Sequence, residues 1–275
     1  MKSSGVMLIE LMIALTISFM VLVALLEMYL SNQRSYKLQT ALSDIQYNAK
    51  SAIAFLAADI QAAGRIGCAR LSADFPLASA TSYTLSPKNK IMVKNANLQV
   101  RHADQVTGRL KDEMRQANKL PVETREYYQA GDILIISDCS KAEIFKIEHV
   151  SLSHGLKIII TSAPLHDLYD QHAEVARFLI NEYSVEKTKQ KNSDGSPRYA
   201  LFKLDIKHQK IRIANNLSNL GMHFTVYSDG EWVDLRADDV DDWAKVVGVA
   251  IEFDVQAASI KKHWHSYVAL QEAVE

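Results

Sequence analysis

The sequence predicts an α+β protein in which one long N-terminal helix precedes an antiparallel β-sheet. Residues 6–30 form an almost uninterrupted apolar run, and apolar side chains recur at helical spacing through residues 31–63. After Pro76 the spacing changes towards the period of a half-buried strand. Because helical and extended segments occupy separate parts of the chain, an α+β order is favoured over alternating α/β units.

Composition excludes several classes of protein. The 275 residues include 31 Lys and Arg against 32 Asp and Glu, a formal net charge of −1, which argues against nucleic-acid binding by bulk charge. Hydrophobic residues make up 48% and charged residues 23%, as in folded rather than disordered chains. The two cysteines, Cys68 and Cys139, are too few for a disulfide-dense scaffold or a four-thiolate zinc site.

Residues 6–30 are long enough to cross a membrane as a helix. They span roughly 37 Å at about 1.5 Å per residue, against a hydrocarbon core of about 30 Å. A cleaved secretory signal is the alternative, but its apolar core is about 7 to 15 residues long and ends at a small-x-small site. This run is longer and ends in YLSNQRSYK. Lys2 precedes the run and Arg34 and Lys37 follow it, so charge leaves the orientation open.

Glu10 places a carboxylate inside the apolar run. Such a group costs a few kcal/mol on insertion scales and is usually functional. A position at headgroup depth is the alternative, although the preceding Val6, Met7 and Leu8 are apolar as well. A fitting partner is a cation held at the same depth, such as the free α-amine of a neighbouring subunit.

The segment MKSSG-VMLIELMIAL resembles the N-terminus of type IV prepilins and type II secretion pseudopilins. In that family a short basic leader ends in Gly and is followed by an apolar residue and a Glu at the fifth mature position. The resemblance implies a leader of residues 1–5 that ends at Gly5, cleavage before Val6, N-methylation of Val6, and an assembly role for Glu10. Val6 departs from the family, because the first mature residue is usually Phe.

Residues 31–63 are predicted to continue the helix as an amphipathic half. Their apolar stripe suits packing against a sheet, because two of its members are the small residue Ala, while a coiled-coil dimer is the alternative. Gly64 is placed to end the helix. The stripe comprises Leu38, Leu42, Ile45, Ala49, Ala52, Leu56 and Ile60, and the polar residues expected off it are Gln33, Lys37, Asp44, Lys50 and Asp59.

The stretch IQYNAKSAIAFLAADIQAAGRIGC is similar to the PilW-type minor pilins. The resemblance covers residues 1–70 and implies a type IV pilin-like fold, with the long helix packed on an antiparallel sheet. GspJ-like pseudopilins share the architecture but less of this stretch. The matching residues are Asn48, Ala52, Leu56, Asp59, Ile60, Ala63, Gly64, Gly67 and Cys68.

Residues 64–275 are predicted to form a β-rich periplasmic domain. Residues 189–197 are expected to form a hairpin loop with positive φ at Gly195, and the charged segment Arg101–Glu126 a loop or short helix before the sheet. The predicted strands are Asp132–Ser137, Glu143–Val150, Leu156–Thr161, Arg177–Lys187, Arg198–Ile206, Lys210–Ala214, Met222–Tyr227, Val246–Val255 and Trp264–Leu270.

Cys68 and Cys139 both follow the apolar run, and their even number permits one disulfide. The resemblance places this part of the chain in the periplasm, which is oxidising. The bridge would close a loop of 71 residues, worth about 4 kcal/mol in the chain-entropy model. Two unpaired buried thiols are the alternative.

No metal site, cofactor site or catalytic constellation is predicted. His263-Trp264-His265 puts two imidazoles on one strand face without a third ligand, and the acidic run 238–242 lacks the Gly and terminal Glu of a calcium loop. His166 with Asp167 and Asp170 lacks a nucleophile elbow, and neither a dinucleotide fingerprint nor a phosphate-binding loop is present.

The resemblance implies a minor pilin of a Gram-negative bacterium, not an enzyme. It implies a single-pass inner-membrane precursor with a periplasmic C-terminal domain, cut by prepilin peptidase and drawn from the lipid bilayer through an assembly platform. With other minor pilins and the major pilin it would prime type IV pili and lie near the tip beside an adhesin. It would thereby support pilus biogenesis, twitching motility, adhesion or DNA uptake, without direct nucleic-acid contact. The alternatives are a GspJ-like minor pseudopilin of type II secretion and a membrane-tethered periplasmic enzyme.

Overall fold

The computed structural model describes most of the chain, and for residues 4–8 and 228 it describes the backbone alone. The first three residues of the predicted leader and the side chain of Val6 therefore lie outside it. The described residues are 4–69, 71–106, 108–153, 155–191, 195–228, 230–258 and 260–270.

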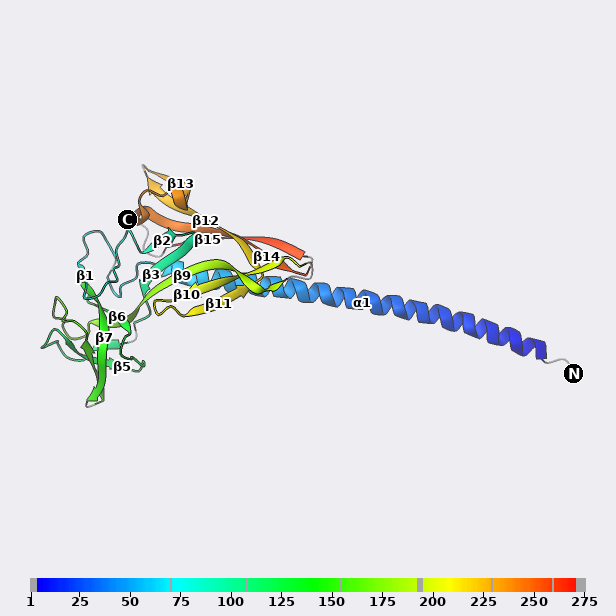
Figure 1. The fold of residues 1–275 in the computed structure, drawn as a ribbon, viewed down its shortest axis with the longest axis horizontal. Coiled ribbons are helices and arrows are strands. Elements are labelled where there is room, and N and C mark those ends of the chain that lie inside the picture. The colour runs from blue at the N-terminus through cyan, green and yellow to red at the C-terminus, as the bar shows by residue number, and fades with distance from the viewer. Residues whose placement is uncertain are drawn as a thin grey trace.

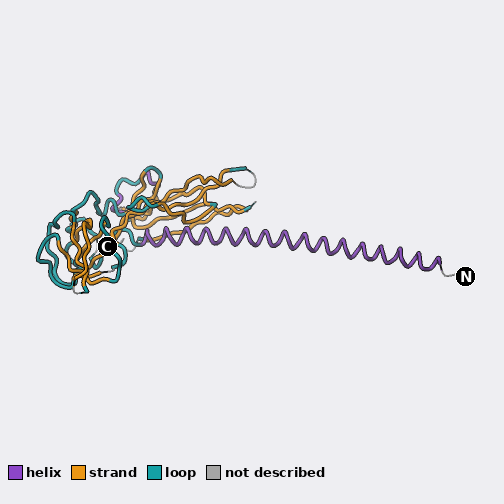
Figure 2. The backbone as a smooth tube through the Cα atoms, turned by 60° about the horizontal axis from the view of Figure 1, so that its bottom comes forward, coloured by secondary structure: helices purple, strands orange, loops and turns teal. Residues whose placement is uncertain are grey.

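One helix, α1 (Ser4–Gln61), contains 58 residues and confirms the predicted continuous helix. Its N-terminal half projects away from the rest of the molecule, and its C-terminal half lies among the strands (Figures 1 and 2). After the helix, Gly64 has φ +82° and its backbone N–H donates to the Arg101 carbonyl at 2.9 Å. The predicted glycine therefore does turn the chain, a little beyond the last helical residue.

The strands of the described residues form two sheets, so the α+β prediction is confirmed, although the division into two was not foreseen. Strands β13, β12, β14 and β15 form a four-stranded sheet in that order, and the others form an eleven-stranded sheet. All pairs are antiparallel except β1 with β7. The strands are β1 (Leu77–Ser79), β2 (Ile91–Lys94), β3 (Asn97–Ala103), β4 (Gly108–Leu110), β5 (Lys119–Thr124), β6 (Ile133–Ser137), β7 (Ala142–Ser153), β8 (Leu156–Thr161), β9 (Glu174–Lys191), β10 (Pro197–Leu204), β11 (Lys210–Asn215), β12 (Leu217–Ser228), β13 (Glu231–Arg236), β14 (Val246–Ala257) and β15 (Ile260–Ala269).

The nine strands predicted from the sequence correspond to β6 through β12, β14 and β15, with ends displaced by a few residues. The hairpin between β9 and β10 is shorter than expected, since β9 continues to Lys191 and β10 begins at Pro197. Gly195 has φ +81°, as predicted. Residues 192–194 of this loop lie outside the described residues.

The prediction that Arg101–Glu126 is a loop or short helix is wrong. The segment contains the end of β3 and all of β4 and β5. Along β4 and β5, buried Leu110, Leu120 and Val122 alternate with polar side chains such as exposed Glu123. The high charge therefore belongs to outward-facing strand positions and connecting turns. The alternation of apolar and polar residues is too short in β4 and β5 to predict a strand in so charged a segment.

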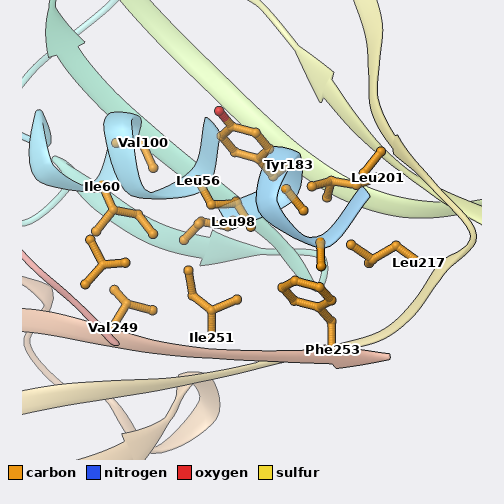
Figure 3. Close-up of a cluster of buried hydrophobic side chains, with 14 of the residues drawn as sticks. Leu56, Ile60, Leu98, Val100, Tyr183, Leu201, Leu217, Val249, Ile251 and Phe253 are labelled. Atoms are coloured by element: carbon orange, nitrogen blue, oxygen red, sulfur yellow. The ribbon is translucent and has the colours of Figure 1, made fainter. Parts of the chain in front are cut away.

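The C-terminal half of α1 packs against both sheets, which confirms sheet packing in place of a coiled coil. It contacts β3 and β11 of the larger sheet and β14 and β15 of the smaller one. Figure 3 shows Leu56 and Ile60 pointing into side chains from β3, β9, β10, β12 and β14. The stripe is buried from Ile45 to Ile60, but Leu38 is 50% exposed because the strands do not extend that far along the helix.

Candidate functional site

The N-terminal half of α1 is bare. Every described side chain from Ile9 to Leu30 is exposed, including large apolar ones such as Phe19 at 68% and Met20 at 72%. Within the described residues, α1 is the one helix long and apolar enough to cross a membrane. An apolar surface of this size requires a covering that the described residues do not supply, either lipid or other helices.

Glu10 lies at the far end of this bare half and is exposed. The first buried residue among the described side chains of the helix is Ala41, which places Glu10 about 46 Å away along an unbroken helix axis. The backbone of Gly5 and Val6 belongs to the same helix. The structure thus puts the predicted cleavage and assembly residues together, remote from the sheets.

The embedded half of α1 is anchored to β11 by polar side chains. Asn48 Oδ1 accepts from the backbone N–H of Asn215 at 2.7 Å, and Ser51 Oγ donates to the Ile213 carbonyl at 3.2 Å. These bonds satisfy backbone groups on the edge strand of the larger sheet. They also fix the position of the helix along that edge.

A second anchor lies near the C-terminal end of α1, where four side chains converge on Asp59. Asn181 Nδ2 and the Tyr183 hydroxyl donate to Asp59 Oδ2 at 2.7 and 2.6 Å, and Lys203 Nζ lies 3.1 Å from the same oxygen. His102 Nε2 lies 3.5 Å from Oδ1. The partners come from β3, β9 and β10, so this one carboxylate ties the helix to three strands.

The electrostatics of this anchor favour the ionised carboxylate. Burial raises the pKa of Asp59, but the close approach of His102, the Tyr183 hydrogen bond and the charge of Lys203 outweigh burial and lower its pKa to about 2. Burial and the adjacent Asp59 charge raise the pKa of Tyr183, which keeps its hydroxyl a donor. The anchor is therefore a buried ion cluster rather than a neutral network.

Asp59 was expected off the apolar stripe, and that expectation is wrong, because only 8% of the residue is exposed. The missed signal is its spacing. Asp59 is three residues after Leu56, and residues at i and i+3 share a helix face. Asn48 and Asp59, two polar members of the PilW-like match, thus both bind strands.

Cys68 and Cys139 form the predicted disulfide, with a Cα–Cα distance of 5.4 Å. The bridge connects the segment after α1 to the end of β6. Gly67, with φ +104°, lies so close to Ser137 that a Cβ atom would collide with its hydroxyl. Asp138 accepts hydrogen bonds from the Ser140 and Lys141 backbone N–H groups at 2.8 and 2.9 Å, which shapes the turn that carries Cys139.

His263 of the histidine pair and Asp242 of the acidic run take part in local contacts. His263 lies between two carboxylates of β14, with Nδ1 3.1 Å from Asp254 Oδ1 and Nε2 3.7 Å from Glu252 Oε2. In the acidic run, Asp242 caps a short 3-10 turn by accepting from the Ala244 backbone N–H at 3.1 Å. Within the described part of the chain, no group of three or more His, Cys, Asp or Glu side chains is arranged to hold a metal ion.

His166 is paired with the fully buried Glu143, not with the neighbouring aspartates. Its backbone N–H lies 3.0 Å from both carboxylate oxygens, and its Nδ1 lies 2.7 Å from Oε1. The hydrogen bond and the charge of Glu143 raise the pKa of His166. This contact holds the loop after β8 against β7.

Comparison with family models, curated proteins and solved structures finds no match to this chain.

Proposed function

We propose that the protein is a minor pilin of a type IV pilus, of the PilW kind, that primes fibre assembly and lies near the fibre tip. The observation that carries the proposal is the division of one continuous helix into a bare apolar half and a half embedded between two sheets. The prepilin-like leader, Gly5, Val6 and Glu10 at the free end supply the chemistry of maturation and assembly.

The bare half fits a subunit whose apolar helix is surrounded by lipid before assembly and by other pilin helices afterwards. Before assembly its apolar side chains lie in the inner membrane, with the β-rich part in the periplasm. In the fibre the same side chains pack on the helices of the major pilin and of other minor pilins. Because Asn48 and Asp59 fix the helix to the strands, the assembly platform moves the β-rich part whenever it moves the helix.

Glu10 fits the role of a charge partner for a neighbouring subunit. A carboxylate in an apolar environment is costly unless an opposite charge accompanies it. The α-amine that prepilin peptidase releases at Val6 of this chain, or at the first mature residue of a neighbour, lies at a comparable depth. Pairing would neutralise both charges.

The test is to isolate the protein from its native cells and determine its N-terminus and its partners. We expect an intact mass that begins at Val6 and co-purification of other minor pilins. Glu10→Gln keeps the volume of the side chain but cannot neutralise an ammonium, so we expect it to reduce partner recovery and surface pili as strongly as Glu10→Ala.

Glu27→Gln is the matched control, since Glu27 is exposed on the same half of the helix. A chain that begins at Met1, or normal piliation of both Glu10 variants, would contradict the proposal. Recovery of secretion pseudopilins in place of pilins would assign the chain to a type II secretion system.

A further inference from the structure

A cavity of about 390 Å³ lies at the end of the molecule opposite the free end of α1. Its walls come from the segment after β1, the start of β6, β7, and the segments after β8 and β10, and β1, β6 and β7 lie at that end in Figure 1. The volume falls within the range of small-molecule sites. The polar lining residues are Thr81, Ser82, Tyr83, Lys146, Ser162 and Lys207.

Three of these walls are fixed to β7 by backbone hydrogen bonds. The three donors are residues of the lining, and the three acceptors are nearly consecutive carbonyls of β7. The cavity therefore keeps its shape without a ligand. The bonds are Ala80 N–H to Ile144 O at 2.8 Å, Gly131 N–H to Ile147 O at 2.8 Å, and Ser162 N–H to Lys146 O at 2.9 Å.

The wall after β1 is also fixed by its own hydroxyl groups. Ser79 Oγ accepts from the Thr81 backbone N–H at 3.1 Å and donates to the Tyr83 carbonyl at 2.7 Å. Thr81 Oγ1 accepts from the Tyr83 backbone N–H at 3.1 Å. These bonds hold the loop that presents Ser82 to the cavity.

The charge of the cavity is positive. Lys207 Nζ lies 2.5 Å from Asp132, and the same carboxylate also accepts from Arg177 at 3.0 Å. One buried carboxylate is thus shared between Lys207, which lines the cavity, and Arg177, which does not, so Asp132 cannot neutralise both cations. Lys146 adds another cation, and no described residue of the lining is acidic.

We propose that this cavity binds a small hydroxylated carboxylic acid of the sugar-acid class. The lysine ammonium groups suit a carboxylate, the hydroxyl groups suit ligand hydroxyls, and Ile133 and Ile206 offer an apolar surface for the face of a ring. A lipid headgroup of the membrane that holds α1 does not reach it, because residues 30–61 alone extend about 46 Å. The inference goes beyond the pilin role and is independent of it.

The experiment is calorimetric titration of the full chain in detergent micelles with galacturonate as the probe. We expect saturable binding of galacturonate, with galactose and inorganic phosphate each at least tenfold weaker, since one lacks the charge and the other lacks the ring. Lys146→Gln should weaken galacturonate binding at least tenfold, and Ser82→Trp, which fills the mouth from an exposed position, should abolish it.

Lys111→Gln is the control, because this exposed lysine pairs with Glu123 away from the cavity. It should bind galacturonate like the parent chain, and all variants should keep the parent's thermal unfolding midpoint. Undetectable galacturonate binding, equal binding of galactose or phosphate, or unchanged binding by a folded Lys146→Gln variant would each overturn the proposal.

Discussion

The two halves of α1 are one helix with opposite relations to the rest of the chain. The half that exposes a continuous run of large apolar side chains is bare, whereas the half whose buried face includes the small residues Ala41, Ala49 and Ala52 is embedded. Small residues allow strands to approach the helix axis closely, and large ones offer area to lipid or to other helices. The comparison teaches that apolar content alone does not tell where a segment is buried. A segment is buried within its own chain only where that chain also supplies the surface that packs against it.

The strongest test of the embedded half is Asp59→Ala. It leaves buried His102, Asn181 and Tyr183 and half-buried Lys203 around a missing carboxylate, and breaking such a cluster costs about 3–5 kcal/mol. Denaturant unfolding of the full chain in micelles measures the loss. Asp44→Ala, an exposed acid of the same helix, should change the free energy of unfolding by less than about 0.5 kcal/mol. Equal effects of the two substitutions would show that the cluster is not an anchor.

The disulfide gives the next largest effect. Cys139→Ser should lower the free energy of unfolding of the β-rich part by about 2–4 kcal/mol, because the unfolded chain regains the freedom of the 71-residue loop. Unfolding with and without a thiol reductant measures it. The reductant should affect the parent chain alone. Sensitivity of the variant to reductant, or free thiols in folded protein isolated from its native cells, would contradict the assignment.

Acidification should weaken the same helix anchor. The pKa of Asp59 is about 2 in the folded chain and about 3.8 when unperturbed. A depressed folded pKa means that the stabilisation is complete above pH 4 and is lost as pH falls towards 2. The difference corresponds to about 2 kcal/mol. The measurement is the free energy of unfolding at pH 5 and at pH 2, and Asp59→Asn should lose less stability between them than the parent chain. An identical pH profile for the two proteins would show that Asp59 does not cause the acid sensitivity.

The smallest effect on stability is expected at Glu10. Glu10→Gln changes an exposed side chain far from any strand, so the free energy of unfolding of the β-rich part should shift by less than about 0.5 kcal/mol. Denaturant unfolding monitored by tryptophan fluorescence checks this, since Trp232, Trp243 and Trp264 all lie in the smaller sheet or beside it. A larger shift would mean that the bare half also supports the fold.

The sequence was most informative where a signal was local. Apolar residues spaced three and four apart placed Ile45 to Ile60 on one face of the helix. Short segments with apolar residues at every second position, separated by polar breaks, located nine strands. Leu38 continued the helical period yet is exposed, since the period says nothing about how far the sheets extend. The division into two sheets was equally hidden, because strand pairing depends on contacts distant in sequence. Asp59 could have been assigned from its spacing to Leu56, but its partners on β3, β9 and β10 could not.

Pilin-like assembly would load the chain along α1, and the Cys68–Cys139 bridge decides which residues carry that tension. Once the anchors at Asn48 and Asp59 have released, a pull on the helix passes through Cys68 and crosses the bridge directly to Cys139 and the strands that follow. Residues 69–138, which include β1 through β6, lie on a covalent side loop and bear none of the backbone tension. With the bridge reduced, the same pull would run through each of those short strands in series and peel them one after another.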